Sequence, residues 1–304
     1  MDDATVPMLI VGLFLVGPVV VVPLGLRLVP TPASERAARV LRVARATAFP
    51  AGIALAIAFL LEPGPIAGLL AAPWFATASL AAVVALLDGI DAVRDGRLFR
   101  PGPHHAARAA LLFLAIAAAN ALADRLGVRP FGFAPLIVLL TAVHFTFAGF
   151  VLVLVGTLAA AAPARWLELA LGALIVGMPV TALGFFGVPP AVLIGALLVA
   201  GGGLGIGLAL LRSAGATDGA ARWLLGVAGL MLVVSMPLAA LYAVGDALGI
   251  AWLDIPMMAR THGALNVMGF ALPAVVALTL VRARADTDGS AITGRAVLAT
   301  ADDR

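Results

Sequence analysis

The chain has 304 residues, of which 63% are hydrophobic and 12% are charged, and its mean hydropathy is +1.13. These values exclude an ordinary soluble domain and indicate a polytopic membrane protein. The net charge of +3 comes with arginines in short connections between apolar segments, so we expect contact with lipid headgroups and no nucleic-acid partner. The absence of cysteine excludes disulfides and thiolate metal ligands.

A membrane-spanning helix needs about 20 apolar residues, and nine segments of the sequence can supply them. These are residues 8–29, 46–61, 65–87, 106–123, 133–160, 166–186, 191–211, 223–245 and 259–281. We therefore predict an all-α fold, a polytopic transmembrane helix bundle that forms a single transmembrane domain over residues 1–284. Residues 285–304 have no apolar face, and we predict that they form a disordered cytoplasmic tail.

The distribution of arginine predicts the orientation of the bundle. All 19 basic residues are arginine, and only Arg125, Arg129 and Arg260 fall on the side of the membrane opposite the first connection. Because cytoplasmic loops are enriched in basic residues, we predict that the N-terminus lies outside and the C-terminus in the cytoplasm. The expected location is the cytoplasmic (inner) membrane.

The first connection carries an arginine repeat. Arginine stands at every third position from 36 to 45, and valines and a leucine lie between the arginines. This pattern predicts a short amphipathic helix over residues 33–45 that lies on the cytoplasmic surface and contacts anionic lipid.

The ninth segment opens with the polar side chains of Arg260, His262 and Asn266 in otherwise apolar surroundings. On a helix, His262 and Asn266 are four residues apart and share a face. His144, in the fifth segment, is the deepest ionisable residue of the predicted bundle, roughly 16 Å from the outer end of its helix. Ionisable residues inside a membrane need a partner or a wet cavity, so they indicate a functional site.

The uncommon polar residues gather in the outer half of the predicted bundle. Pro179 and Pro237 would interrupt the sixth and eighth segments nearby and free carbonyl groups at Ile175 and Val233. We therefore predict one outer pocket that contains both histidines. The candidate acid–base groups are His144, His262, Asp246 and Glu62. The candidate substrate-binding groups are Asn120, Thr141, Thr181, Tyr242, Arg260 and Asn266.

Each of these residues also has a purely structural interpretation. A neutral histidine can bond to a neighbouring helix for packing alone, and asparagines commonly link membrane helices. Arg260 can extend its side chain to the interface, and Glu62 can be a solvated loop residue.

Asp88, Asp91 and Asp95 follow the third segment at a D-x-x-D-x-x-x-D spacing. The spacing resembles the magnesium–diphosphate motif of intramembrane prenyltransferases of the UbiA type, in which carboxylates on one helical face hold Mg²⁺. That chemistry normally uses two such clusters, and Asp218 is the only acid in the connection where a second would lie. The alternative is a solvated, charge-balanced loop. We predict no metal and no cofactor.

Residues 201–207 are rich in glycine but lie in the middle of the seventh segment, with no strand before them. A nucleotide-binding loop requires a strand-to-helix turn. We therefore predict close helix packing through the pairs Gly201/Gly205 and Gly203/Gly207.

At the two histidine segments the chain resembles the YndJ-like family of bacterial membrane proteins. The resembling pieces are HFTFAGF at residues 144–150 and THGALNVMGF at residues 261–270. Val267 stands where a small residue is expected, a departure that leaves His262 and Asn266 in place. The resemblance implies a similar multi-span layout and indicates that both segments belong to one site. It implies no mechanism.

Three functions follow from these observations. The first is an intramembrane enzyme that acts by acid–base chemistry on a lipophilic isoprenoid or lipid, such as a cyclase or isomerase. The second is a proton-coupled small-molecule exporter with His144 as the relay, and the third is a non-catalytic membrane scaffold. The odd number of segments and the lack of an evident inverted repeat favour the enzyme over the exporter. The expected partners are membrane lipids and a lipophilic small molecule.

Overall fold

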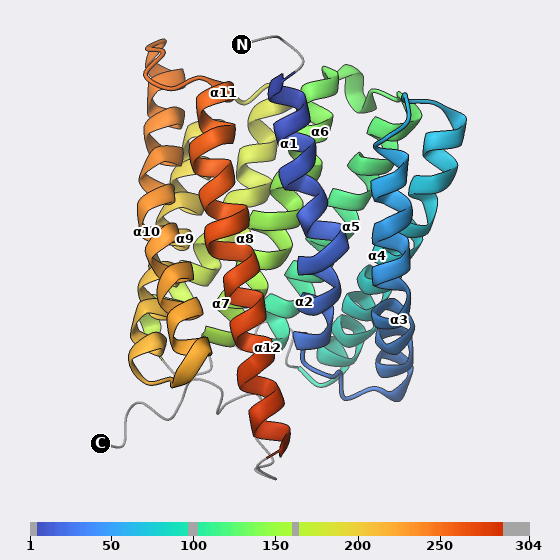
Figure 1. Cartoon of the computed structure of the whole chain (residues 1–304), viewed down its shortest axis with the longest axis vertical. Helices are drawn as coiled ribbons and strands as arrows, with labels where there is room; N and C mark the ends of the chain where they lie inside the picture. The colour runs from blue at the N-terminus through green and yellow to red at the C-terminus, as the bar shows by residue number, and fades with distance from the viewer. Residues whose placement is uncertain (1–4, 97–102, 160–163, 288–304) are drawn as a thin grey trace. The chain divides into compact units, whose positions relative to one another are not determined.

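A computed structural model of the chain describes residues 5–96, 103–159 and 164–287 (Figure 1). Within these residues every regular element is helical, and nine helices or helix series are long and apolar enough to cross a membrane. This confirms the all-α fold and the nine predicted spans. The orientation of the termini stays a prediction. The last helix ends at Thr287, three residues into the tail that was predicted to be disordered from position 285, and the rest of that tail lies outside the described residues.

The elements follow one another with short connections. In chain order they are α1 (Thr5–Val16), η1 (Gly17–Val21), α2 (Val22–Leu28), α3 (Glu35–Ala58), α4 (Pro65–Arg94), α5 (Pro103–Leu126), η2 (Pro130–Gly132), α6 (Pro135–His144), η3 (Phe145–Leu152), α7 (Val153–Ala159), α8 (Arg165–Phe185), α9 (Pro189–Gly215), α10 (Gly219–Leu248), α11 (Ile255–Met258), η4 (Ala259–Gly263), η5 (Leu265–Ala271) and α12 (Leu272–Thr287). Four of them, η1, η3, η4 and η5, are π-helical, whereas η2 is a 3₁₀ turn.

The chain forms two compact units. The N-terminal unit comprises Val11–Leu154, and the C-terminal unit comprises Met1–Ile10 together with Val155–Arg304. In the N-terminal unit, α3 packs against η1 and α4, α4 packs against α5, and α5 packs against α6 and η3. The backbones approach closely where glycine permits it, since a side chain at Gly52 of α3 would collide with the main chain of Pro18 in η1.

Helix α3 corrects the predicted division at residue 45. The predicted surface helix and the predicted second span form one continuous helix from Glu35 to Ala58. Arg45 also does not extend into solvent, because its guanidinium donates hydrogen bonds of 2.8 Å to the carbonyl oxygens of both Leu26 and Val29. These are carbonyl groups at the end of α2 that lack a helical partner. The position of the arginine-bearing turns at the cytoplasmic face stays a prediction.

In the C-terminal unit, α8, α9 and α10 run side by side, and α10 also packs against η5 and α12 (Figure 1). The glycine-rich stretch packs closely, as predicted, but not through Gly201, where a methyl group would have no neighbouring atom within 4 Å. A methyl group at Gly202 would lie 2.6 Å from the Ala170 carbonyl oxygen, and one at Gly207 would lie 3.0 Å from that of Gly229.

Neither proline that was predicted to break a span ends its helix. Helix α8 continues through Pro179, and α10 continues through Pro237. A proline inside a helix still removes one backbone donor. Membrane helices tolerate this loss where neighbouring groups compensate for it.

Large apolar side chains remain on the outside of both units. Leu69 of α4 and Leu169 of α8 are each 74% exposed. Such surfaces are unfavourable in water and suit contact with lipid chains. The chain is therefore a multi-pass integral membrane protein.

Candidate functional site

The two histidine segments coincide with π-helical turns. His144 is followed directly by η3, His262 lies in η4, and Asn266 lies in η5. π-helical turns are rare and are frequently found at functional sites. The backbone therefore departs from regular α-helix at both segments whose polar residues indicated a site.

His262 is joined to two neighbouring groups in the C-terminal unit. Its Nδ1 atom lies 3.0 Å from the main-chain carbonyl oxygen of Ser235 in α10. The side-chain nitrogen of Asn266 donates to the carbonyl oxygen of His262 over 2.7 Å and lies 3.2 Å from Nδ1. Ser235 is fully buried, whereas His262 and Asn266 are half-buried.

These distances assign the proton on the His262 ring. A carbonyl oxygen only accepts hydrogen bonds, so Nδ1 carries a hydrogen and donates it to Ser235. The amide group of Asn266 then bonds to the His262 carbonyl, and its contact with Nδ1 adds no second hydrogen bond in the neutral ring. The lone pair of the neutral imidazole is consequently on Nε2, the nitrogen that can accept a proton.

Ser235 is absent from the predicted site residues. Ser235 contributes its main-chain carbonyl, which any residue could supply. The identity of its side chain therefore could not predict this contact. The nearest indication is its position two residues before Pro237. The sequence predicted a freed carbonyl at Val233, but the histidine bonds to the carbonyl of Ser235.

Three predicted site residues lie on α10 and on the turns after it. Tyr242 is half-buried, whereas Asp246 and Arg260 are exposed. Asp254 caps α11, because its Oδ1 accepts a 2.7 Å hydrogen bond from the main chain of Met257. Tyr242 and Asp246 are four residues apart on one helix, and Asp254 and Arg260 follow in the next turns of the chain.

Thr181 belongs to the contact between α8 and α9. Its hydroxyl donates to the carbonyl oxygen of Gly177 over 2.9 Å, and a side chain at Gly195 of α9 would collide with it. The structure thus gives Thr181 a packing role.

His144 is bonded within its own helix, in the N-terminal unit. Its Nδ1 lies 2.7 Å from the carbonyl oxygen of Leu140, so Nδ1 donates and the lone pair of the neutral ring is on Nε2. The side chain is exposed. The π-helical segment η3 that follows packs against η1, where a methyl group at Gly17 would lie 2.9 Å from the Thr146 side chain.

Two other predicted binding residues of this unit also bond to their own helices. Thr141 donates to the carbonyl oxygen of Ile137 over 2.7 Å, and Asn120 donates to that of Ile116 over 3.0 Å. Side chains that bond to the carbonyl four residues earlier satisfy one donor without help from a neighbouring helix. These bonds by themselves do not join either residue to His144.

Glu62 is exposed in the connection between α3 and α4. The neighbouring Arg125, which is only 9% exposed, donates to the carbonyl oxygen of Leu61 over 3.2 Å and pairs with Asp124 at 2.6 Å. Its guanidinium also lies 4.1 Å from the centre of the Phe59 ring. Arg125 therefore anchors this connection, a structural role that was not predicted from the sequence.

The end of α4 corrects the loop alternative for the three aspartates. Asp88 and Asp91 lie inside this helix, which continues to Arg94, and not in a loop. Oδ2 of Asp88 lies 3.6 Å from Nε of Arg108 in α5, with side chains 19% and 11% exposed. Asp91 pairs with Arg94 at 3.7 Å. Among the described residues, no group of three or more His, Cys, Asp or Glu residues could hold a metal ion.

The structure thus brings His262, Asn266 and Ser235 together in the C-terminal unit. It places His144, Thr141, Asn120 and Glu62 in the N-terminal unit. The pocket shared by the two histidines stays a prediction.

Comparison with known proteins adds one match. The model of a family described as YndJ-like protein matches residues 12–270, a range that includes both histidine segments. No curated protein and no solved structure matches the chain.

Proposed function

The chain belongs to the YndJ-like family, and we propose that it is an intramembrane enzyme that acts by acid–base chemistry on a lipophilic substrate. The observation that carries this proposal is the hydrogen bond between His262 Nδ1 and the carbonyl oxygen of Ser235. A histidine whose Nδ1 is held by a carbonyl has a defined tautomer and orientation, which is how proteins prepare Nε2 as a base.

The proposed reaction is an isomerisation or cyclisation of an isoprenoid or another unsaturated lipid. In the isomerisation, Nε2 of His262 removes a proton from a carbon next to a double bond, and the electron pair of that C–H bond forms a new double bond. The electrons of the original double bond accept a proton at the distant carbon from the imidazolium. The product has the same atoms as the substrate, and no oxidant, metal or cofactor is required. Asn266 holds the main chain of His262 during both transfers.

Deuterium uptake tests this proposal even though the substrate is unidentified. The purified full-length protein is reconstituted with a total lipid extract of its own source cells in D₂O, and the lipids are analysed by mass spectrometry. We expect one lipid species to gain deuterium at carbon. His262→Gln should lower this uptake at least about 100-fold, the usual loss when a general base is removed. Uptake that is absent, or unchanged in His262→Gln, would contradict an enzyme that uses His262.

A matched control is available on the same helix series. Thr279 bonds to the Val275 carbonyl oxygen of its own helix, at 2.8 Å. Thr279→Val should fold like the parent protein and retain deuterium uptake. Size-exclusion chromatography of both variants checks that loss of uptake does not come from unfolding.

The position of His144 inside a membrane-spanning helix favours a second candidate, a proton-coupled exporter. Titratable side chains within membrane-spanning helices commonly belong to proton relays. In proteoliposomes with an enclosed pH-sensitive dye, His144→Gln should then abolish substrate-driven proton flux, while deuterium uptake stays at zero in every variant. A scaffold would give neither signal.

A further inference from the structure

We propose that a single anionic phospholipid binds between α3 and α4, with its phosphate on Arg36 and Arg39 and one hydrocarbon chain along the groove below them. This site lies in the N-terminal unit and is formed by neither histidine segment. It is independent of the proposed enzymatic function.

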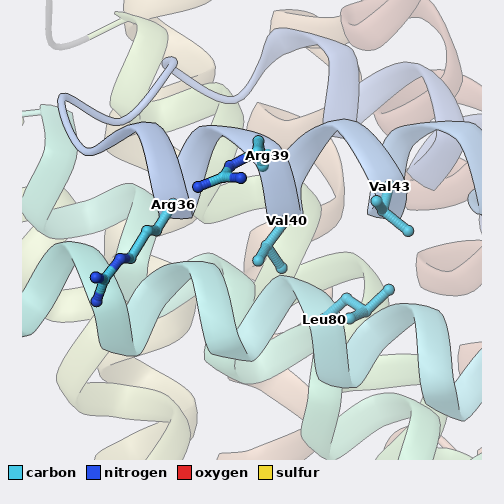
Figure 2. A pocket seen from close by; sticks show the side chains of 5 residues that line it. All are labelled: Arg36, Arg39, Val40, Val43 and Leu80. Atoms are coloured by element: carbon cyan, nitrogen blue, oxygen red, sulfur yellow. The ribbon is translucent and has the colours of Figure 1, made fainter.

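The groove consists of two adjoining hollows with volumes of about 350 and 460 Å³, which share Leu80 of α4. The first is lined by Arg36, Arg39, Val40 and Val43 of α3 (Figure 2). Figure 2 shows Arg36 extending toward α4, with Val40 and Leu80 facing each other across the groove. The second hollow continues along the same two helices.

One end of the groove is cationic. The side chains of Arg36 and Arg39 are exposed, and neither has a hydrogen-bond or ion-pair partner in the part of the chain that the structure describes. Arg45, by contrast, is engaged with the end of α2. Guanidinium groups bind phosphate oxygens through paired hydrogen bonds, so two adjacent arginines suit a phosphate headgroup.

The rest of the groove suits a hydrocarbon chain. Pro50 and Pro73 carry no backbone donor, and neighbouring alanines leave space between the helices. The two threonines in the groove satisfy each other, because Thr77 donates to the Thr47 hydroxyl over 3.0 Å and Thr47 donates to the Val43 carbonyl oxygen over 3.0 Å. Few polar groups are therefore left for a polar ligand.

The length of the groove also fits a lipid chain. Fourteen positions separate Val40 from Ala54 on α3, which corresponds to roughly 21 Å at ~1.5 Å per residue. One leaflet contributes about half of the roughly 30 Å hydrocarbon core. A chain that starts at the arginines can thus follow the groove through a whole leaflet.

Native mass spectrometry of the purified full-length protein tests the proposal, with phosphatidylglycerol and phosphatidylcholine as the probes. We expect one phosphatidylglycerol to be retained in preference to phosphatidylcholine. Arg36→Gln and Arg39→Gln should each weaken its retention about fivefold, because each arginine near an anionic lipid surface contributes about 1 kcal/mol to binding. The two losses multiply in the double variant, which should weaken retention about 30-fold.

Two further variants separate the groove from general surface charge. Arg42 is an exposed arginine of the same helix that does not line the groove, so Arg42→Gln should change retention less than about twofold. Ala76 is exposed and lines the groove, so Ala76→Phe should fill it and weaken retention with all arginines intact.

Several results would contradict the proposed phospholipid site between α3 and α4. Equal retention of the two lipids, or an Arg42→Gln effect equal to that of Arg36→Gln, would indicate diffuse attraction. Unchanged retention in Ala76→Phe would exclude a chain in the groove. A dimer that Ala76→Phe dissociates, without bound lipid, would assign the groove to a second copy of the protein.

Discussion

The imidazole Nδ1 of His262 and the main-chain carbonyl oxygen of Ser235 lie 3.0 Å apart and connect η4 to α10. The contact joins a ring that can exchange protons to a carbonyl that side-chain substitution does not remove. The second group that holds the histidine is Asn266, whose amide donates to the His262 carbonyl oxygen at 2.7 Å. The Ser235 carbonyl and Asn266 both hold the histidine, and of these two Asn266 can be removed by mutation.

Asn266→Ala should lower the expected deuterium uptake about 10-fold while His262 stays in place. The loss of a positioning hydrogen bond typically reduces activity by about 10- to 100-fold. Lipid mass spectrometry in D₂O provides the measurement, and the double variant Asn266→Ala/His262→Gln should be no worse than His262→Gln alone, because both act on one group. Additive losses in the double variant would argue against a positioning role.

Cross-linking should test the predicted pocket that contains both histidines. The chain has no cysteine, so the double variant His144→Cys/His262→Cys carries the only two thiols. We expect a short thiol-specific cross-linker to join them within one chain, visible by intact-mass analysis after reaction. If only singly modified thiols appear with reagents that reach about 15 Å, the side chains are too far apart for one small substrate or a bridging water, and the shared pocket is wrong.

Single cysteines should also report the orientation of the bundle. The arginine distribution predicts that the connection before α3 is cytoplasmic and the connection before α6 is outside. Thr31 and Arg129 are exposed in these two connections. In intact cells, a membrane-impermeant maleimide should label Arg129→Cys and should label Thr31→Cys only after the cells are opened. The reverse pattern would contradict the predicted orientation.

The largely buried pair of Asp88 and Arg108 should contribute more to stability than the exposed pair of Asp91 and Arg94. Replacing Arg108 by Leu leaves Asp88 without its cation, so we expect a loss of about 3 kcal/mol in the free energy of unfolding, measured by SDS titration. The double variant Asp88→Leu/Arg108→Leu should recover part of the loss, because it also removes the unpaired charge.

Arg94 provides the control for this comparison. It is 75% exposed and pairs with Asp91 on the same helix, so Arg94→Leu should cost less than about 1 kcal/mol. Equal losses for Arg94→Leu and Arg108→Leu would mean that burial does not strengthen the Asp88–Arg108 pair.

Sequence reasoning succeeded where the membrane itself dictates the structure. Backbone polar groups cannot remain unpaired in hydrocarbon, so long apolar segments must be helices, and their number follows from their length. The nine spans were predictable for this reason. The proximity of His262 and Asn266 was predictable as well, because four residues along a helix bring side chains to one face, and the widened turns of η4 and η5 still leave the two in contact.

Only the tertiary structure decided which helices exchange contacts. The spans are apolar nearly all round, so no hydrophobic face identifies the neighbour of each helix. For this reason the Ser235 carbonyl, the Arg108 partner of Asp88 and the Arg45 contacts with the end of α2 were not predicted. Each depends on a packing arrangement between segments separated in sequence. A polar group in hydrocarbon takes whichever partner that packing presents, because an unpaired group there costs several kcal/mol.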